Sequence, residues 1–252
     1  MLAAWHFPVL FGTGLVAGFV DSIAGGGGLI TIPVLLSSGL DPQQALGTNK
    51  LQASFGSGSA SWHYARAGAV DVRDCVRGFI LAMTGAAVGA VLVQRVSPSF
   101  LKRFIPLLLI AIALYMLLRP RLGDRPRPQV MPRLGFDLLF GLGIGFYDGF
   151  FGPGTGTFWA MAYVTCLGFD LTRATGYTKV MNFASNLSSL AFFLWGGNVL
   201  FGAGLVMGAG QLVGARLGAG VVIKRGTQLI RPVFISVVVL LALKLLYEVY
   251  AK

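Results

Sequence analysis

The chain has 252 residues, of which 55 % are hydrophobic and only 12 % are charged, and its formal net charge is +11. A soluble globular domain carries about 25 % charged residues, so this composition excludes a soluble globule and indicates a membrane protein with several spans. Most basic residues lie in short segments between apolar runs, which is typical of loops that orient membrane helices. We therefore expect a lipid bilayer around the chain and no nucleic-acid partner.

The first apolar run, residues 7–36, is interrupted by four consecutive glycines, Gly25 to Gly28. A continuous helix over this run would be roughly 45 Å long, whereas the hydrocarbon core of a bilayer is about 30 Å thick. Consecutive glycines break a helix because they add backbone freedom and offer no side-chain packing. The run is therefore predicted to form two pieces, of which the second, residues 29–36, ends or turns inside the membrane.

Three longer helices are predicted after the broken element in each half of the chain. Asp41 and Asp170 precede the first of these helices, where an N-cap residue belongs. The predicted ranges are 42–64, 75–94 and 99–118 in the first half, and 171–195, 201–222 and 227–249 in the second. The predicted fold class is therefore an all-α, polytopic helical membrane protein.

The two halves are copies of one unit. The segment Gly-Phe-Val-Asp21-Ser-Ile-Ala-Gly-Gly-Gly reappears 127 positions later as Gly-Phe-Tyr-Asp148-Gly-Phe-Phe-Gly-Pro-Gly. Further along, Gly-Thr-Asn-Lys50 matches Gly-Tyr-Thr-Lys179 at an offset of 129 positions. We therefore divide the chain into a first repeat (1–118), a basic, Pro-rich linker (119–133) and a second repeat (134–252).

Loop charge predicts that the two repeats insert in opposite orientations. Segments 66–77 and 119–133 are rich in arginine and are expected to face the cytoplasm. The counterpart of the first, 195–200, has no charged residue, although 95–103 and 224–231 are both basic. Inverted repeats are common in secondary transporters. We expect two pseudo-symmetric, inverted repeats, each with a broken or re-entrant helix and about three spanning helices.

Ionisable residues inside apolar spans indicate where the function resides, because each costs about 2.5–3.5 kcal/mol on insertion unless it is paired or hydrated. Lys50 and Lys179 lie at equal depth, roughly 13 Å into their helices. With the backbone N–H groups freed at the glycine breaks, they predict an anion site. The candidate substrate-binding residues are these lysines, their polar neighbours and the glycines of the breaks: Thr48, Asn49, Lys50, Gln52, Thr178, Lys179, Asn182, Gly25, Gly26, Gly27, Gly154 and Gly156.

Asp21 and Asp148 are candidates for proton coupling, because burial of a carboxyl group favours its protonated form. A structural alternative is that Lys50 and Lys179 pair with these carboxylates only to neutralise them, and that the glycines serve close packing. Repetition of the whole motif order in both halves favours the functional interpretation. Asn186, one turn beyond the candidate Asn182, is a further candidate for the same cavity.

These motifs resemble those of the sulfite exporter TauE/SafE family of membrane permeases. The resemblance rests on Asp21-Ser-Ile-Ala-Gly-Gly-Gly-Gly-Leu-Ile-Thr-Ile-Pro33, on Gly-Thr-Asn-Lys50, and on Gly-Tyr-Thr-Lys179-Val-Met-Asn182, and it covers nearly the whole chain. It implies transport of small sulfur-containing anions, such as sulfite or sulfonates, across a bacterial inner membrane. Tyr177 stands where the family often has threonine, which bears on the size of the binding pocket.

The sequence thus predicts a multi-pass secondary transporter that binds a small sulfur oxyanion or organosulfur anion at the membrane midplane between the repeats. A passive anion channel would use the same lysines, and a purely structural scaffold would not need them. An enzyme is not expected, because no histidine cluster, Cys–His pair or nucleophile beside a base occurs. Two cysteines and two histidines lack metal-ligand spacing, so we expect neither metal nor cofactor. Whether copies assemble into a homo-oligomer is left open.

Overall fold

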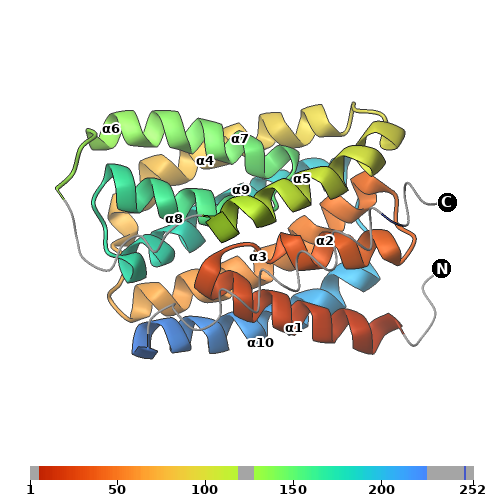
Figure 1. The fold of residues 1–252 in the computed structure, drawn as a ribbon, viewed down its shortest axis with the longest axis horizontal. Coiled ribbons are helices and arrows are strands. Elements are labelled where there is room, and N and C mark those ends of the chain that lie inside the picture. Colours follow the sequence, from red (N-terminus) through yellow and green to blue (C-terminus); the bar gives the residue numbers. More distant parts are fainter. Residues whose placement is uncertain (1–5, 119–127, 226–246, 248–252) are drawn as a thin grey trace.

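The computed structural model describes residues 6–118 and 128–225 together with Tyr247. Within these residues the chain is all-helical and contains no strand (Figure 1). The predicted fold class is therefore confirmed. Residues 119–127 of the predicted linker, and the predicted last helix 227–249 apart from Tyr247, lie outside the described residues.

For the predicted helices that the structure describes, the boundaries agree with the predicted ranges to within about three residues. In chain order the elements are α1 (His6–Ala24), α2 (Gly28–Ser37), α3 (Pro42–Arg66), α4 (Val72–Val93), α5 (Pro98–Leu118), α6 (Arg133–Phe136), the π-helical turn η1 (Asp137–Gly141), α7 (Leu142–Phe150), α8 (Thr155–Cys166), α9 (Leu171–Trp195) and α10 (Phe201–Arg225). The segment that matches α1 in the second half is thus divided into α6, η1 and α7.

The chain breaks at the predicted glycines in both halves. Between α1 and α2, Gly25 and Gly26 have φ angles of +68° and +134°; between α7 and α8, Gly152 and Gly154 have φ angles of +90° and +77°. Glycine adopts positive φ without the steric penalty of a Cβ atom, which explains the breaks. The helices that follow, α2 with 10 residues and α8 with 12, are about 15 and 18 Å long. Both are too short to cross a bilayer.

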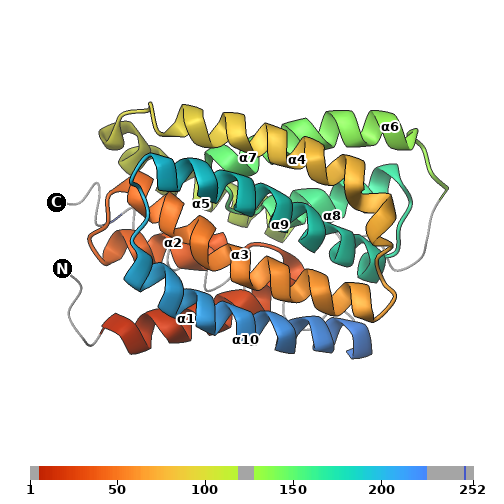
Figure 2. The same cartoon turned by 180° about the vertical axis from the view of Figure 1, so that it is seen from behind.

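The helices form layers around two polar helices. Within the described residues, four helices are long and apolar enough to cross a membrane, over His6–Ile23, Val72–Val93, Pro98–Tyr115 and Phe201–Ile223. In contrast, α3 and α9 carry many polar side chains and run through the middle of the bundle, between α1 and α10 on one side and α4 and α7 on the other (Figures 1 and 2). The polar side chains are therefore enclosed by the apolar helices.

Glycines allow the outer helices to pack backbone against backbone, and each such contact joins the two halves. A Cβ atom at Gly214 of α10 would lie 2.0 Å from the carbonyl oxygen of Leu15 in α1. At the matching positions, a Cβ atom at Gly85 of α4 would lie 2.3 Å from the carbonyl oxygen of Leu142 in α7. Small residues at helix contacts of this kind are typical of membrane proteins. Matching positions of the two halves thus make matching contacts with the opposite half.

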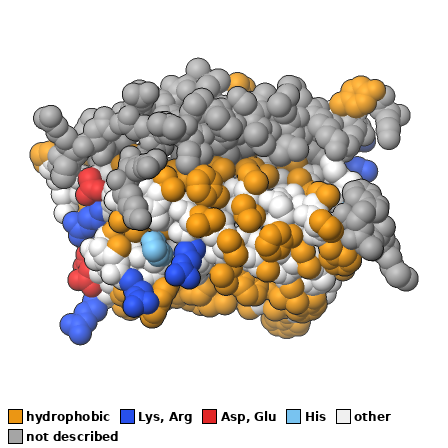
Figure 3. All heavy atoms as spheres, turned by 90° about the horizontal axis from the view of Figure 1, so that it is seen from below, with side chains coloured by type: hydrophobic (Ala, Val, Ile, Leu, Met, Phe, Trp, Pro, Cys, Tyr) orange, Lys and Arg blue, Asp and Glu red, His pale blue; other side chains and the backbone are white. Residues whose placement is uncertain are grey.

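Charge is distributed unevenly along the bundle. In Figure 3 hydrophobic side chains cover the middle of the visible face, and most of its charged side chains gather at one end. At the end where α4, α6 and α9 begin, Arg133 approaches Asp74 and Asp137, and Arg173 lies against Tyr177. The positive-inside rule predicts that this arginine-rich end faces the cytoplasm.

The close contact between α4 and α7 can be tested with two glycines of α7. A Cβ atom at Gly145 would lie 2.5 Å from the carbonyl oxygen of Ala82, whereas one at Gly143 would have no neighbour within 4 Å. We expect Gly145→Ala to push the helices apart and to lower the free energy of unfolding by about 1–3 kcal/mol. Gly143→Ala should be neutral or stabilising by up to about 1 kcal/mol, because alanine favours the helix. Thermal unfolding in detergent micelles measures both effects, and equal melting temperatures would contradict the packing.

Candidate functional site

The two buried lysines are paired with carboxylates of the opposite half. The Nζ atom of Lys50, in α3, lies 2.6 Å from Oδ1 of Asp148, in α7. The Nζ atom of Lys179, in α9, lies 2.8 Å from Oδ2 of Asp21, in α1. Both lysine side chains are at most 1 % exposed. The ion pairs anticipated as a structural alternative are therefore present, and they connect the halves crosswise.

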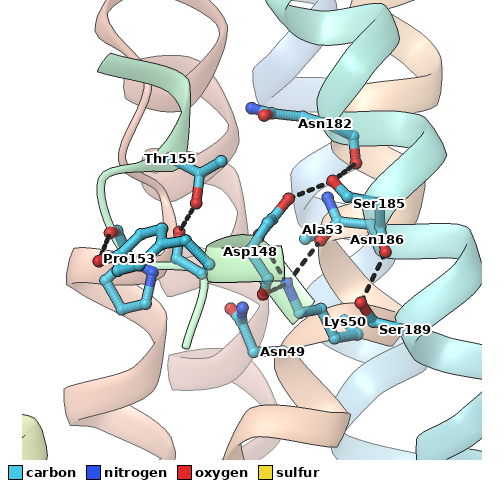
Figure 4. A network of polar contacts seen from close by, with 12 residues as sticks. Asn49, Lys50, Ala53, Asp148, Pro153, Thr155, Asn182, Ser185, Asn186 and Ser189 are labelled. Carbon is cyan, nitrogen blue, oxygen red and sulfur yellow. Dashed lines mark hydrogen bonds and ion pairs between the residues drawn. The ribbon is translucent and has the colours of Figure 1, made fainter. Parts of the chain in front are cut away.

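Asp148 belongs to a dense polar network with α3 and α9 (Figure 4). Lys50 donates to both the side chain and the main-chain carbonyl of Asp148, and it lies 3.4 Å from Oδ1 of Asn186. The other carboxylate oxygen of Asp148 accepts a hydrogen bond from the hydroxyl of Ser185. Each charge is thus satisfied by an opposite charge and further hydrogen bonds, which is what burial of an ion pair requires.

Asp21 is held differently, by the backbone at the first break. Its Oδ1 atom accepts hydrogen bonds from the N–H groups of Gly26, at 2.8 Å, and Gly27, at 2.9 Å. These N–H groups precede the first turn of α2, where a helix has unpaired donors and attracts negative charge. At the second break the position that matches Gly26 is Pro153, which has no N–H group. The two carboxylates therefore have different partners, although their positions in the repeats match.

The two breaks meet at the centre of the bundle. A Cβ atom at Gly25 would lie 2.5 Å from the carbonyl carbon of Gly156, and one at Gly156 would lie 2.7 Å from the Cα atom of Gly25. The hydroxyl of Thr157 also donates to the carbonyl oxygen of Gly25, at 3.1 Å. Glycine at both positions is needed for this approach, because any side chain would separate the broken helices.

A small polar cavity lies between the broken helices and α3, α9 and α10. The volume of the cavity is about 30 Å³, which is room for about two water molecules. The residues that line it are Asp21, Gly26, Gly27, Gly28, Asn49, Ala53, Asp148, Gly152, Thr155, Gly156, Asn182, Asn186 and Gln211. Asp21 and Asp148 are its charged members, and both lysines lie behind them. The cavity wall therefore carries negative charge, and the two lysines, which do not line the cavity, compensate it.

Several predicted site residues point away from this cavity. Thr48 accepts a hydrogen bond from the N–H of Leu200, at 2.9 Å, and so fixes the connection between α9 and α10. Gln52 donates to Oδ1 of Asn49 at 2.7 Å and is fully buried behind it. Thr178 is also buried and does not line the cavity. Of the predicted glycines, Gly26, Gly27 and Gly156 line the cavity, whereas Gly25 and Gly154 do not.

Tyr177 does not restrict the cavity either. Its ring lies 5.5 Å from the guanidinium carbon of Arg133, and its hydroxyl donates to Oδ2 of Asp74 at 3.3 Å. This contact lies at the arginine-rich end of the bundle. The expectation that Tyr177 bears on pocket size is therefore not supported by its position.

Gln211 was missed in the sequence because the repeat comparison gave no signal there. Its matching position in the first half is Ala82, and it lies in a mainly apolar part of α10. Gly56 and Gly18 make room for it, since a Cβ atom at either position would lie 2.0 or 3.0 Å from its Oε1 atom. A single amide in a run of apolar residues was the available clue. Ser185, which holds Asp148, was missed for the same reason: its counterpart is Gly56.

The chain is similar to known membrane proteins over nearly its whole length. A family model described as "Sulfite exporter TauE/SafE" matches residues 10–245. The chain is 49 % identical over 240 residues to a "Probable membrane transporter protein" of Haemophilus influenzae, covering 95 % of this chain and 94 % of that protein. It is 45 % identical over 252 residues to "Probable membrane transporter protein YfcA" of Escherichia coli K12, covering 100 % of this chain and 94 % of the relative. A more distant relative, "Probable membrane transporter protein YunE" of Bacillus subtilis, is 24 % identical over 269 residues, covering 96 % of this chain and 98 % of that protein.

The coupling within one ion pair can be measured by a double-mutant cycle. Lys50→Met removes the ammonium group and leaves Asp148 buried without its partner, so we expect a loss of about 3–5 kcal/mol in the free energy of unfolding. Adding Asp148→Asn should restore most of this loss, because the uncompensated charge is then removed. Thermal unfolding in micelles provides the measurement. Lys102→Met, at an exposed position of α5, is the control and should change stability by less than about 0.5 kcal/mol. If Lys50→Met were as stable as the wild type, the Lys50–Asp148 ion pair would not be a buried, stabilising contact.

Proposed function

Because the chain belongs to the sulfite exporter TauE/SafE family, we propose that this membrane transporter is a secondary transporter of small sulfur oxyanions or organosulfonates. The proposed site is the central cavity. The observation that carries the proposal is the position of this cavity, where the two broken helices meet between two buried lysine–carboxylate pairs that join the halves. Transporter sites commonly lie at the centre of the membrane, beside discontinuous helices at the interface of two repeats.

Three kinds of group support an anionic substrate. Lys50 and Lys179 supply positive charge, although each lies behind a carboxylate. The N–H groups of Gly26 and Gly27 supply backbone donors at the start of a short helix, which is a favourable place for an oxyanion. The amides of Asn49, Asn182, Asn186 and Gln211 add donors around the cavity wall.

Charge balance supports coupling of the anion to a proton. The two lysines and two carboxylates together have no net charge, so an anion entering alone would add an uncompensated negative charge to a buried site. Such a charge is costly in a medium of low dielectric constant. Protonation of Asp21 or Asp148 would remove this cost, and both carboxylates line the cavity. We infer that one of them carries the coupling proton.

The crosswise pairs also suggest how the two halves move. One pair joins α3 to α7 and the other joins α9 to α1, so both connect the first half of the chain to the second. Rocking of one half against the other would expose the site alternately to the two sides of the membrane. The cavity holds about two water molecules in this conformation, so a sulfur oxyanion needs a wider one.

Flux measurements in reconstituted vesicles test this proposal. Sulfite, thiosulfate, sulfate and small sulfonates should be screened with and without a pH gradient. For the preferred anion, the variant with both Lys50→Gln and Lys179→Gln should be slower by at least about tenfold, because one buried charge contact typically contributes about 1.4 kcal/mol or more. Lys102→Gln, on the exposed face of α5, is the control and should transport at the wild-type rate.

Two further outcomes decide between the alternatives. Accumulation of the anion against its gradient, abolished by a proton ionophore, supports a proton-coupled secondary transporter, whereas purely downhill flux that is insensitive to the ionophore indicates a passive channel. If the double variant folds and still carries the anion at full rate, the assignment of the lysines is wrong.

A further inference from the structure

We propose that Asp21 is an internal ligand of the anion site, which a substrate oxyanion replaces when Asp21 becomes protonated. The site in question is the Asp21 cradle, which we define as the N–H groups of Gly26 and Gly27 and the ammonium group of Lys179. This inference rests on the proposed function and extends it, because it names the donors that receive the substrate and the residue that competes with it.

The cradle has the donors that an oxyanion requires. One carboxylate oxygen of Asp21 accepts the two N–H groups at 2.8 and 2.9 Å, and the other lies 2.8 Å from Lys179. Two backbone donors at a helix N-terminus with a nearby ammonium group form a favourable anion site. A sulfonate or sulfite group offers oxygens of the same kind as a carboxylate. The cradle therefore suits a substrate anion as well as it suits the side chain that it holds.

The cradle opens onto the cavity. Gly26, Gly27 and Asp21 all belong to the cavity wall, whereas Lys179 lies behind Asp21, so a ligand reaches its ammonium group once the Asp21 side chain has moved away. The side chain of Asp21 is 19 % exposed, compared with 5 % for Asp148. Asp21 is thus the carboxylate that a proton in the cavity reaches more readily.

An independent observation comes from Asn182, in α9. This residue is 6 % exposed and lines the cavity, and its buried Oδ1 atom has no hydrogen-bond partner among the described residues. In Figure 4 its side-chain amide extends away from α9 toward the side where Thr155 lies. An unsatisfied buried acceptor costs about 1–3 kcal/mol. A protonated Asp21 becomes a hydrogen-bond donor, and Asn182 is an acceptor on the same cavity that could receive it.

The second half of the chain does not offer an equivalent cradle. Pro153 replaces Gly26 and removes one of the two N–H donors, and Asp148 is held by Lys50 and Ser185 instead. Within residues 6–118 and 128–225 the two halves therefore provide one such site. We infer that one anion binds together with one proton.

The exchange balances charge and hydrogen bonds. A proton binds the Asp21 carboxylate, the neutral carboxylic acid leaves the cradle, and the three donors turn to an oxygen of the substrate. One positive and one negative charge enter together, so the net charge of the site is unchanged. The titratable groups around Asp21 are Lys179 from α9 and Tyr64 from α3, and Asp148 from α7, which is paired with Lys50, lines the same cavity. The groups described from the break before α2, from α8 and from α10 are neutral: Gly26, Gly27, Thr157 and Gln211.

Binding of methanesulfonate to the purified full chain in lipid nanodiscs tests the inference. Methanesulfonate stays a monoanion between pH 5 and 8, so any pH dependence of its affinity belongs to the protein. Isothermal titration calorimetry should be performed with the wild type, Asp21→Asn and the control Asp41→Asn, each confirmed as monodisperse. Both variants replace one carboxylate by an amide, but Asp41 is exposed before α3 and lies outside the cavity, so only Asp21→Asn changes the cradle.

For the wild type, we expect the affinity to rise by up to about tenfold per pH unit as the pH falls through the range in which Asp21 takes up its proton. Asp21→Asn should bind tightly at every pH with no such slope, and Asp41→Asn should keep the wild-type slope. Should Asp21→Asn not fold, calorimetry of the wild type in buffers of different ionisation enthalpy still decides, because one proton must be taken up per anion bound.

Different results would refute the inference alone or the inference together with the proposed function. A flat pH profile in the wild type, a slope that survives in Asp21→Asn, or no proton uptake refutes the internal ligand while leaving anion transport standing. If the wild type binds neither methanesulfonate nor sulfite at any pH, both the inference and the proposed function fail.

Discussion

The structure depends on the neutralisation of two lysines in the middle of a membrane bundle. An ammonium group buried in a medium of low dielectric constant is tolerated only beside an opposite charge with further hydrogen bonds. Lys50 and Lys179 find these charges in the opposite half of the chain, on Asp148 and Asp21. This requirement brings α3 against α7 and α9 against α1, so it links the halves at the depth where the helices break. It also explains why the most polar helices, α3 and α9, lie in the middle layer.

Glycine is the second requirement for joining the two halves, because the paired charges meet where the helix backbones approach closely. Gly25 and Gly156 touch where the two breaks meet, and Gly85 and Gly214 let outer helices pack against main-chain oxygens of the opposite half. Larger residues would force these segments apart, because a Cβ atom at any of the four positions would lie 2.0 to 2.7 Å from a main-chain atom of the neighbouring segment. The high glycine content, 36 of 252 residues, is therefore as much a condition of the polar centre as of the helix contacts.

The two halves resemble each other most in their packing and least at the cavity. Contacts between outer helices occur at matching positions, whereas around the cavity Gly26 is matched by Pro153, and Gln211 by Ala82. Packing constrains the size of a residue, and both halves share that constraint. Hydrogen bonding at the cavity depends on single donors and acceptors, so one substitution is enough to make the halves different there. This asymmetry is what supports a single substrate site in a duplicated chain.

The sequence by itself determined the helical class, the boundaries of the predicted helices that the structure describes, both breaks and the family, because apolar runs, consecutive glycines and repeated motifs are local features of the chain. Only the tertiary structure decided that the ion pairs are crosswise and that carboxylates, not ammonium groups, line the cavity. It also turned Thr48 and Gln52 away from the cavity and brought Gln211 to it. Successive residues of a helix point about 100° apart, and the ion-pair partners of the two lysines lie 98 and 158 residues away in the chain. Which side chain faces which partner is therefore settled by the packing of whole helices, and no local pattern records it.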